Sequence, residues 1–135
     1  MECIKLGVIG VGRIGRLHVE NICYRIPGAE VTTITDINKT AAQETAEKFQ
    51  IPSVVDTYQE VLNSADVDAV VICSSTDTHA EIIEAAAKAK KHIFCEKPVD
   101  TDLKRIYETM KVVRENKVLF QIGFNRRFDH NHSVI

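Results

Sequence analysis

The chain has 135 residues, of which 44% are hydrophobic and 27% are charged. This length suits a single domain with a buried core, and the composition is too apolar for a disordered chain. The formal net charge is -2, with lysines and arginines scattered along the chain. That distribution argues against nucleic acid or an anionic membrane as a partner and favours a small-molecule ligand.

The cellular setting is inferred from the N-terminus and the cysteines. A strand pattern follows Met1 directly, without the features of a signal peptide, and no apolar run approaches the roughly 20 residues that span a bilayer. We therefore expect a cytoplasmic protein. The cysteines, Cys3, Cys23, Cys73 and Cys95, form no Cys-x-x-Cys pair. We expect them to be buried thiols rather than disulfides or metal ligands.

Strands and helices are expected to alternate along the whole chain. In the first half, the hydrophobic pattern predicts strand 4–9, helix 14–24, strand 30–35, helix 38–49 capped by Asn38, and an edge strand 52–55. A capping box of Thr57 and Glu60 opens a short helix, and strand 69–73 follows. The second half then predicts a helix from a capping box of Thr78 and Glu81 to residue 90, strand 92–95, helix 101–116 and strand 118–122.

The order of these elements predicts the fold class. Apolar strands separated by helices indicate a parallel sheet that is covered on both faces, with right-handed crossovers. The expected fold is a single α/β domain with a doubly wound parallel sheet, over residues 1–123. Residues 124–135 are expected to begin the connection to a second, substrate-binding domain, because the chain stops there without a helix or cap.

A Gly-x-Gly-x-x-Gly motif follows the first expected strand and opens the first helix. Such glycines also form ordinary turns, but this position is the one that dinucleotide-binding folds require. The first glycine would permit a tight turn, the second would let the backbone approach a pyrophosphate, and the third would let the helix pack on the sheet. N–H groups at the helix start would face the anion. We predict an NAD(P)-binding Rossmann fold whose loop contacts are Gly10, Gly12, Arg13, Ile14 and Gly15.

Asp36 ends the second expected strand, about 20 residues beyond Gly15, where Rossmann folds carry an acidic residue for the adenosine ribose. Its carboxylate would repel the 2′-phosphate of NADP, so we predict NAD as the cofactor, with NADP bound less tightly. Lys39 nearby weakens this preference, because a basic residue tolerates the extra phosphate. The alternative interpretation of Asp36 is a loop carboxylate or a helix cap.

Polar side chains follow the fourth expected strand. Ligands of open α/β sheets bind beyond the carboxyl ends of the strands. The hydroxyls of Ser74, Ser75 and Thr76 would meet the ribose or nicotinamide portion of the cofactor there. Thr78 is interpreted instead as a cap of the next helix. His79 fits a cofactor contact and a surface histidine equally well.

Glu96, Lys97 and Pro98 end the fifth expected strand, at the same edge as the glycine motif. An isolated Glu–Lys pair is usually a solvated surface pair. At this edge, however, Lys97 would hydrogen-bond a substrate hydroxyl and ease removal of its proton as hydride leaves. Glu96 would lie beside the cofactor, and Pro98 would fix the turn in a trans or cis form.

Two adjacent arginines, Arg126 and Arg127, follow the sixth expected strand. Without a wider basic surface they are poor evidence for nucleic-acid binding, and we expect Arg127 at the cofactor or substrate edge. His130 and His132 have no third ligand at a suitable spacing, so no metal site is predicted.

These motifs together resemble the Gfo/Idh/MocA oxidoreductases, and within that family the inositol 2-dehydrogenases. The resemblance covers the whole chain and rests on residues 7–18, Asp36, 74–80, 91–98 and 123–129, of which Glu96-Lys97-Pro98 is the most family-specific motif. It implies NAD(P)-dependent oxidation of a ring alcohol, such as myo-inositol, to a ketone, with Lys97 as a catalytic or substrate-orienting residue. Ser75-Thr76-Asp77 replaces the Thr-Pro-Asn of many relatives, which favours the inositol subgroup. Lys90 replaces a common glycine and affects only the shape of a turn.

The resemblance also implies residues that this sequence does not contain. The family places an Asp-x-x-x-His pair in a second domain that binds substrate and builds the oligomer. We therefore expect the chain alone to bind NAD with little turnover of myo-inositol, and its parent to be a homo-oligomeric dehydrogenase of polyols or sugars. The alternatives are a non-catalytic NAD(P)-binding redox sensor, or a fragment of another Rossmann reductase, of amino-acid or tetrapyrrole metabolism.

Overall fold

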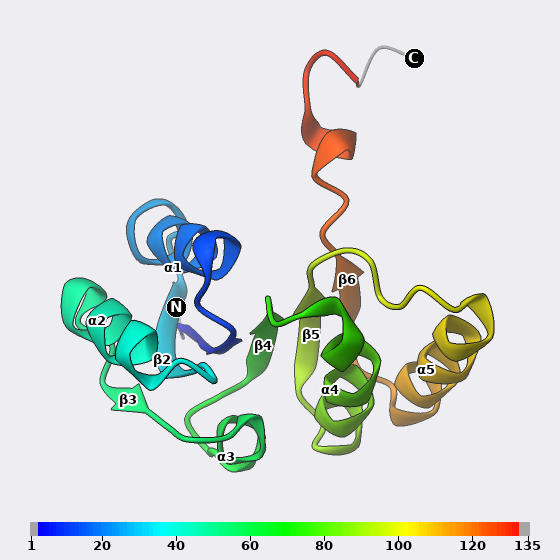
Figure 1. Ribbon diagram of the computed structural model, residues 1–135, viewed down its shortest axis with the longest axis horizontal. Helices are drawn as coiled ribbons and strands as arrows, with labels where there is room; N and C mark the ends of the chain where they lie inside the picture. The colour runs from blue at the N-terminus through cyan, green and yellow to red at the C-terminus, as the bar shows by residue number, and fades with distance from the viewer. Residues whose placement is uncertain (1–2, 133–135) are drawn as a thin grey trace.

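The computed structural model describes residues 3–132. Predictions about Met1 and about residues 133–135 lie outside this range. In chain order the elements are β1 (Ile4–Ile9), α1 (Arg13–Arg25), β2 (Ala29–Thr35), α2 (Lys39–Phe49), β3 (Ser53–Val54), α3 (Tyr58–Asn63), β4 (Ala69–Ile72), α4 (Thr76–Lys88), β5 (His92–Cys95), α5 (Leu103–Asn116), β6 (Phe120–Ile122) and the 3-10 helix η1 (Asn125–Phe128). The predicted alternation of strands and helices is confirmed (Figure 1).

The six strands form one parallel sheet in the order β3-β2-β1-β4-β5-β6. This is the strand order of doubly wound dinucleotide-binding folds. The order reverses direction between β1 and β4, so the connections from these two strands diverge and leave a crevice at their carboxyl ends. The fold thus places the candidate site at the end of β1, where the glycine motif lies.

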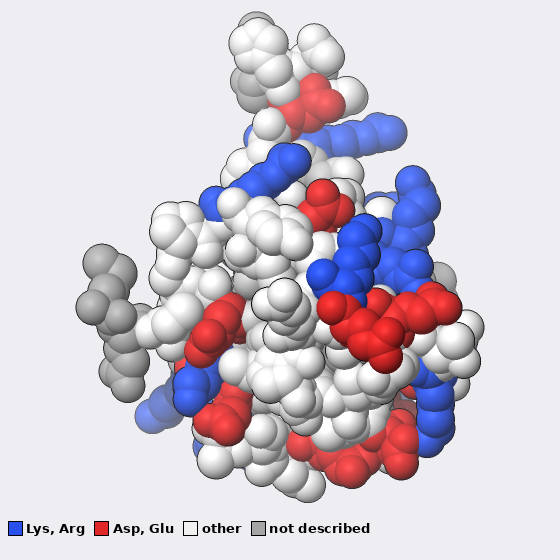
Figure 2. All heavy atoms as spheres, turned by 90° about the vertical axis from the view of Figure 1, so that its left-hand side faces the viewer, with Lys and Arg blue, Asp and Glu red and all other residues white. Residues whose placement is uncertain are grey.

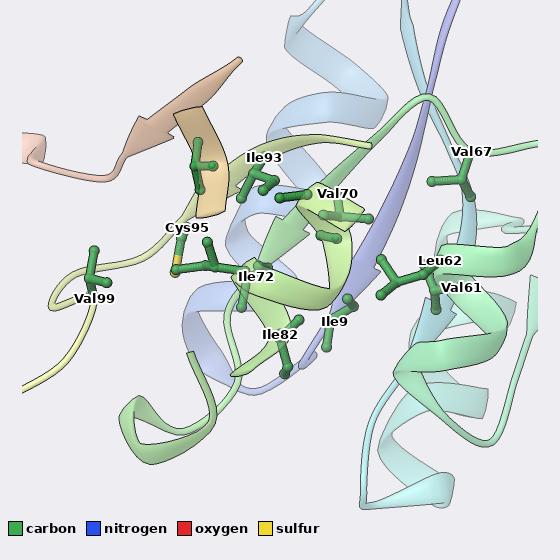
Figure 3. Close-up of a cluster of buried hydrophobic side chains, with 14 residues drawn as sticks. Ile9, Val61, Leu62, Val67, Val70, Ile72, Ile82, Ile93, Cys95 and Val99 are labelled. Atoms are coloured by element: carbon green, nitrogen blue, oxygen red, sulfur yellow. The ribbon is translucent and has the colours of Figure 1, made fainter. Parts of the chain in front are cut away.

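The sheet separates two hydrophobic cores. Helices α1 and α2 cover one face, and α3, α4 and α5 cover the other (Figure 1). Successive strand residues point to opposite faces: on β4, Val70 belongs to the core under α3, α4 and α5, and Val71 to the core under α1 and α2. Figure 3 shows the core under α3, α4 and α5, to which Ile72, Ile82 and Ile93 contribute. Burial on both faces explains why the strands are continuously apolar.

Helix ends agree with most of the predicted caps. Asn38 caps α2, and Thr57 and Glu60 form the predicted capping box of α3. The capping box predicted for Thr78 and Glu81 is wrong, because α4 begins earlier. Ser75 is its N-cap residue, and Thr78 lies within the first turn, where its backbone N–H donates to the Ser75 carbonyl.

Charged side chains on the face that carries α1 and α2 are of both signs (Figure 2). Lysines and arginines lie beside aspartates and glutamates there, and one such pair is Arg16 on α1 with Glu44 on α2, 3.5 Å apart. Between residues 3 and 132 the structure has no helix that is both long and apolar enough to cross a membrane.

Candidate functional site

The glycine motif forms the turn between β1 and α1. Gly10 has a φ of 92°, a conformation that favours glycine, and a side chain there would lie 2.6 Å from the backbone of Cys73 and Ser74. Gly15 packs against the carbonyl oxygen of Gly10, which an added Cβ would overlap. Gly12 faces open space, with nothing within 4 Å of an added Cβ. The tight turn, exposed backbone and close packing expected of these glycines are all present.

The N-terminus of α1 is open toward an incoming anion. Gly12 is the N-cap residue and supplies no side-chain hydrogen bond, and the first turn contains no acidic residue. Backbone N–H groups and the helix dipole make such a helix end attractive to phosphate. Arg13 and Ile14 are exposed in the same turn. The geometry therefore fits a pyrophosphate at this helix end.

Asp36 follows β2, and its carboxylate holds the glycine turn. Its Oδ2 accepts a hydrogen bond from the Val11 N–H at 2.7 Å, and its Oδ1 accepts one from the Asn38 N–H at 2.7 Å. Each carboxylate oxygen has a second lone pair for a ribose hydroxyl. Lys39, the residue considered as a partner for a 2′-phosphate, forms an ion pair with Asp56. The basic charge in this loop is therefore already paired with a carboxylate of the chain.

A groove of about 570 Å³ lies along the carboxyl edge of the sheet, within the usual range of small-molecule sites. It brings together five predicted contacts: Gly10, Gly12, Asp36, Ser74 and Ser75. Its remaining lining residues are Ile9, Thr35, Ile37, Asp56, Thr57, Tyr58, Gln59, Cys73, Thr78, Glu81 and Ile82. A pocket walled by the ends of β1, β2 and β4 is where the strand order places a ligand.

The connection from β3 to α3 forms a wall of this groove that sequence reasoning missed. Thr57, Tyr58 and Gln59 contribute to it. The hydroxyl of Tyr58 donates to Glu81 on α4 at 2.6 Å, and burial, together with this carboxylate, raises the pKa of Tyr58 to about 12. The phenol thus stays protonated and ties α3 to α4. The sequence could have indicated this wall, because the predicted edge strand 52–55 also ends at the carboxyl edge of the sheet.

His79 lies inside the protein, so its interpretation as a surface histidine is wrong. Its side chain is only 2% exposed. Nε2 lies 2.9 Å from the carbonyl oxygen of Ser74, and Nδ1 lies 2.7 Å from that of Pro98. Both oxygens can only accept hydrogen bonds. The ring therefore bridges the end of β4 to the turn after β5, and a direct contact of its nitrogens with a cofactor stays a prediction.

Glu96 is held between α1 and β6 rather than paired with the neighbouring lysine. Its Oε1 lies 2.7 Å from Nε2 of His18, and its Oε2 accepts the backbone N–H of Lys97 at 3.3 Å. Gly123 leaves room for this carboxylate, because an added Cβ there would lie 3.1 Å from it. Glu96 therefore differs from the carboxylate of a usual solvated Glu–Lys surface pair. His18 was not predicted as part of this edge.

Lys97 is exposed, and its Nζ has no hydrogen bond or ion pair with another residue between 3 and 132. The Lys97–Pro98 peptide bond is cis. Val99, which follows, is buried in the core under α4 and α5. The turn therefore carries an available ammonium group on a backbone that is anchored on both sides, by Glu96 before it and Val99 after it.

Residues 4–124 match the model of the Gfo/Idh/MocA family, described as an oxidoreductase family with an NAD-binding Rossmann fold. The chain belongs to this family. It is 48% identical over 132 residues to an uncharacterized oxidoreductase, YrbE, of Bacillus subtilis, and 41% identical over 128 residues to a myo-inositol 2-dehydrogenase of Thermotoga maritima. These matches cover 98% and 95% of the chain. The predicted family and the NAD-binding fold are confirmed.

Solved structures agree with the sequence comparison. The scyllo-inositol dehydrogenase of Lactobacillus casei, with bound NAD(H) and scyllo-inositol, superposes with a TM-score of 0.91 at 34% identity, over 96% of this chain. The chain spans 38% of the length of this structure and of both relatives above. It is therefore the NAD-binding domain of a Gfo/Idh/MocA protein, and NAD is the cofactor of this fold.

Several predicted contacts of this Gfo/Idh/MocA domain do not line the groove, among them Arg13, Ile14, Gly15, Thr76, His79, Glu96, Lys97 and Arg127. Gly15 acts through packing, and Glu96 and Lys97 follow the end of β5, the strand next to β4 at the same edge. Arg127 is exposed in η1, which extends away from the sheet (Figure 1). Its role at the cofactor or substrate edge stays a prediction.

The cysteines are free thiols in different surroundings. Burial raises the pKa of the Cys73 and Cys95 thiols to about 12, and the charge of Glu96 adds to it. Both groups therefore stay protonated and unreactive. Cys23 is exposed, so the expectation of a buried thiol is wrong there. Residues 3–132 contain no cluster of three or more His, Cys, Asp or Glu residues that could hold a metal ion.

Proposed function

We propose that this chain is the cofactor half of an NAD-dependent dehydrogenase that oxidises a ring hydroxyl of a cyclic polyol. Myo-inositol, converted to its 2-keto product, is the best candidate substrate. Relatives named for myo-inositol and scyllo-inositol support the substrate class. Myo-inositol and scyllo-inositol are stereoisomers. The preference of this protein for one of them is therefore the finer part of the proposal.

The arrangement of the carboxyl edge carries this proposal. The groove beside Asp36 suits the adenosine, and the N-terminus of α1 suits the pyrophosphate. The remaining nicotinamide end then extends along the edge toward the ends of β4 and β5, where Ser74, Glu96 and Lys97 lie. NAD contributes a hydride acceptor when it is bound.

Lys97 performs the step that this domain contributes to the chemistry. Its ammonium group donates a hydrogen bond to the substrate hydroxyl, and this stabilises the negative charge that develops on oxygen as the carbon loses hydride. The hydroxyl proton leaves as the C–O bond becomes a carbonyl. Glu96 holds the lysine backbone through its Oε2. The proton acceptor is assigned to the Asp-x-x-x-His pair of the family, outside residues 1–135.

The remaining parts of the proposal concern the whole protein. We place the substrate contacts and the homo-oligomer interface in the part of the relatives that this chain does not span. A cytoplasmic location is supported by the protonated free thiols of the half-buried Cys73 and the buried Cys95, since such thiols are usual in reducing compartments.

Substrate oxidation is tested by supplying the whole protein with NAD and a panel of myo-inositol, scyllo-inositol and D-glucose. We expect NADH absorbance to grow fastest with myo-inositol. The 135-residue chain measured alone should bind NAD with little turnover. Binding of NAD without NADH formation from any ring alcohol would favour the alternatives, a redox sensor or a fragment of another Rossmann reductase.

Cofactor preference is expected to depend on Asp36. Titration calorimetry should show NAD binding about tenfold more tightly than NADP, a difference of about 1.4 kcal/mol, because the carboxylate repels the 2′-phosphate. Asp36→Asn keeps one acceptor oxygen but removes the charge, and it should bring the two affinities together. A chain that binds NADP as tightly as NAD before substitution would contradict this preference.

A further inference from the structure

We propose that His79 is a positioning residue that sets the place of Lys97 at the carboxyl edge. The inference rests on the proposed function of Lys97 but concerns a different residue, on α4. No other side chain of residues 3–132 is shown to bond both the end of β4 and the turn after β5.

The turn needs such a support because its own bonds are few. Glu96 is fixed by His18 and by pairing of its N–H with Ile72, and Val99 is buried. Between them, the Lys97 N–H donates to Glu96 Oε2 at 3.3 Å, whereas Pro98 has no N–H to donate, so its carbonyl oxygen is the polar backbone group through which Pro98 itself can be held. The Nδ1 of His79 lies 2.7 Å from that oxygen.

The second ring nitrogen of His79 also has a defined partner. Nε2 of His79 lies 2.9 Å from the carbonyl oxygen of Ser74, and Ser74 lines the groove. A neutral imidazole has one N–H and donates to one of these oxygens, whereas the doubly protonated ring donates to both. The ring is 2% exposed, so water does not substitute for either partner. His79 therefore sets the separation between the groove wall and the Lys97 turn.

Two substitutions separate the two bonds. His79→Asn places an amide nitrogen where Nδ1 was, so it keeps a donor toward Pro98 and leaves no polar atom in contact with Ser74. His79→Gln places an amide nitrogen where Nε2 was, so it keeps the donor toward Ser74 and loses the one toward Pro98. Both remove buried ring atoms, so a general loss of stability should be similar in the two variants.

The backbone amides of Lys97 and Val99 are the direct readout, followed by NMR in the 135-residue chain. We expect His79→Gln to shift both amides and to lower their order parameters, while His79→Asn leaves them close to the unsubstituted chain. Equal effects of the two substitutions on these amides would overturn the positioning role. If neither variant folds, the unsubstituted chain must show a through-hydrogen-bond coupling between His79 Nδ1 and the Pro98 carbonyl carbon, and its absence overturns the proposal.

The link to the function of Lys97 is measured separately, as the change in the NMR chemical shift of Lys97 Nζ when NAD is added. We expect the signal to move in the unsubstituted chain and in His79→Asn, and to move less than half as far in His79→Gln. A full movement in His79→Gln would overturn the inference. If Nζ fails to respond in the unsubstituted chain while the Gly12 amide does, the proposed role of Lys97 fails, and the amide comparison still decides the role of His79.

Discussion

Replacing Gly12 with alanine is expected to weaken NAD binding about a hundredfold, equivalent to about 2.7 kcal/mol, without changing the stability of the chain. The added Cβ meets no protein atom within 4 Å, and the backbone at this position has a φ of -64°, which alanine readily adopts. In the proposed binding mode, the methyl group would instead occupy the space in which a pyrophosphate approaches the backbone.

Titration calorimetry with NAD measures the binding loss, and urea denaturation measures stability. Leu17→Ala is a suitable control, because Leu17 lies on the same helix, is 51% exposed and does not line the groove. It should leave NAD binding unchanged. If Gly12→Ala binds NAD as tightly as the unsubstituted chain, the pyrophosphate does not lie at this helix end.

Gly15→Ala, unlike Gly12→Ala, is expected to lower the stability of the fold itself. The methyl group would overlap the carbonyl oxygen of Gly10 and lie 2.9 Å from its carbonyl carbon. Both atoms belong to backbone in a tight turn, so α1 must move away from β1. Overpacking of this kind costs about 1–3 kcal/mol and sometimes more, a large part of the roughly 5–15 kcal/mol that stabilises a domain.

The loss should appear as a lower urea midpoint with an unchanged slope, and as a lower melting temperature, by about 4 °C for each kcal/mol at this chain length. Gly12→Ala serves as the matched control, since it adds the same methyl group three residues earlier. Equal stability of the two variants would show that helix and sheet are not in close contact at Gly15.

The family and the fold could be predicted because their signals are local. Continuous apolar strands, helices with their own caps, and glycines at the end of β1 each depend on a few neighbouring residues. Gly10, Gly12 and Asp36 line the groove at the expected edge for the same reason: the end of a parallel strand has a known place in the sheet, whatever the side-chain packing.

Partners of individual side chains were harder to predict because they depend on strand order and helix direction. His18 and Glu96 are far apart in the sequence, yet α1 and β5 bring them to 2.7 Å. A surface position was one of the two alternatives for His79, but the residue lies on the buried side of α4 and is only 2% exposed. The pairing of Lys39 with Asp56 likewise required β3 to lie next to β2.

The sequence by itself determined the parallel doubly wound fold, the glycine turn and the acidic end of β2, because strand apolarity, glycine spacing and strand ends are properties of short segments. Only the tertiary structure decided which residues line the groove and what holds the backbone at Lys97. The wall at Tyr58 lies just beyond the end of β3, and the two contacts of His79 join the ends of the neighbouring strands β4 and β5. Such contacts between distant segments exist only once the sheet has formed.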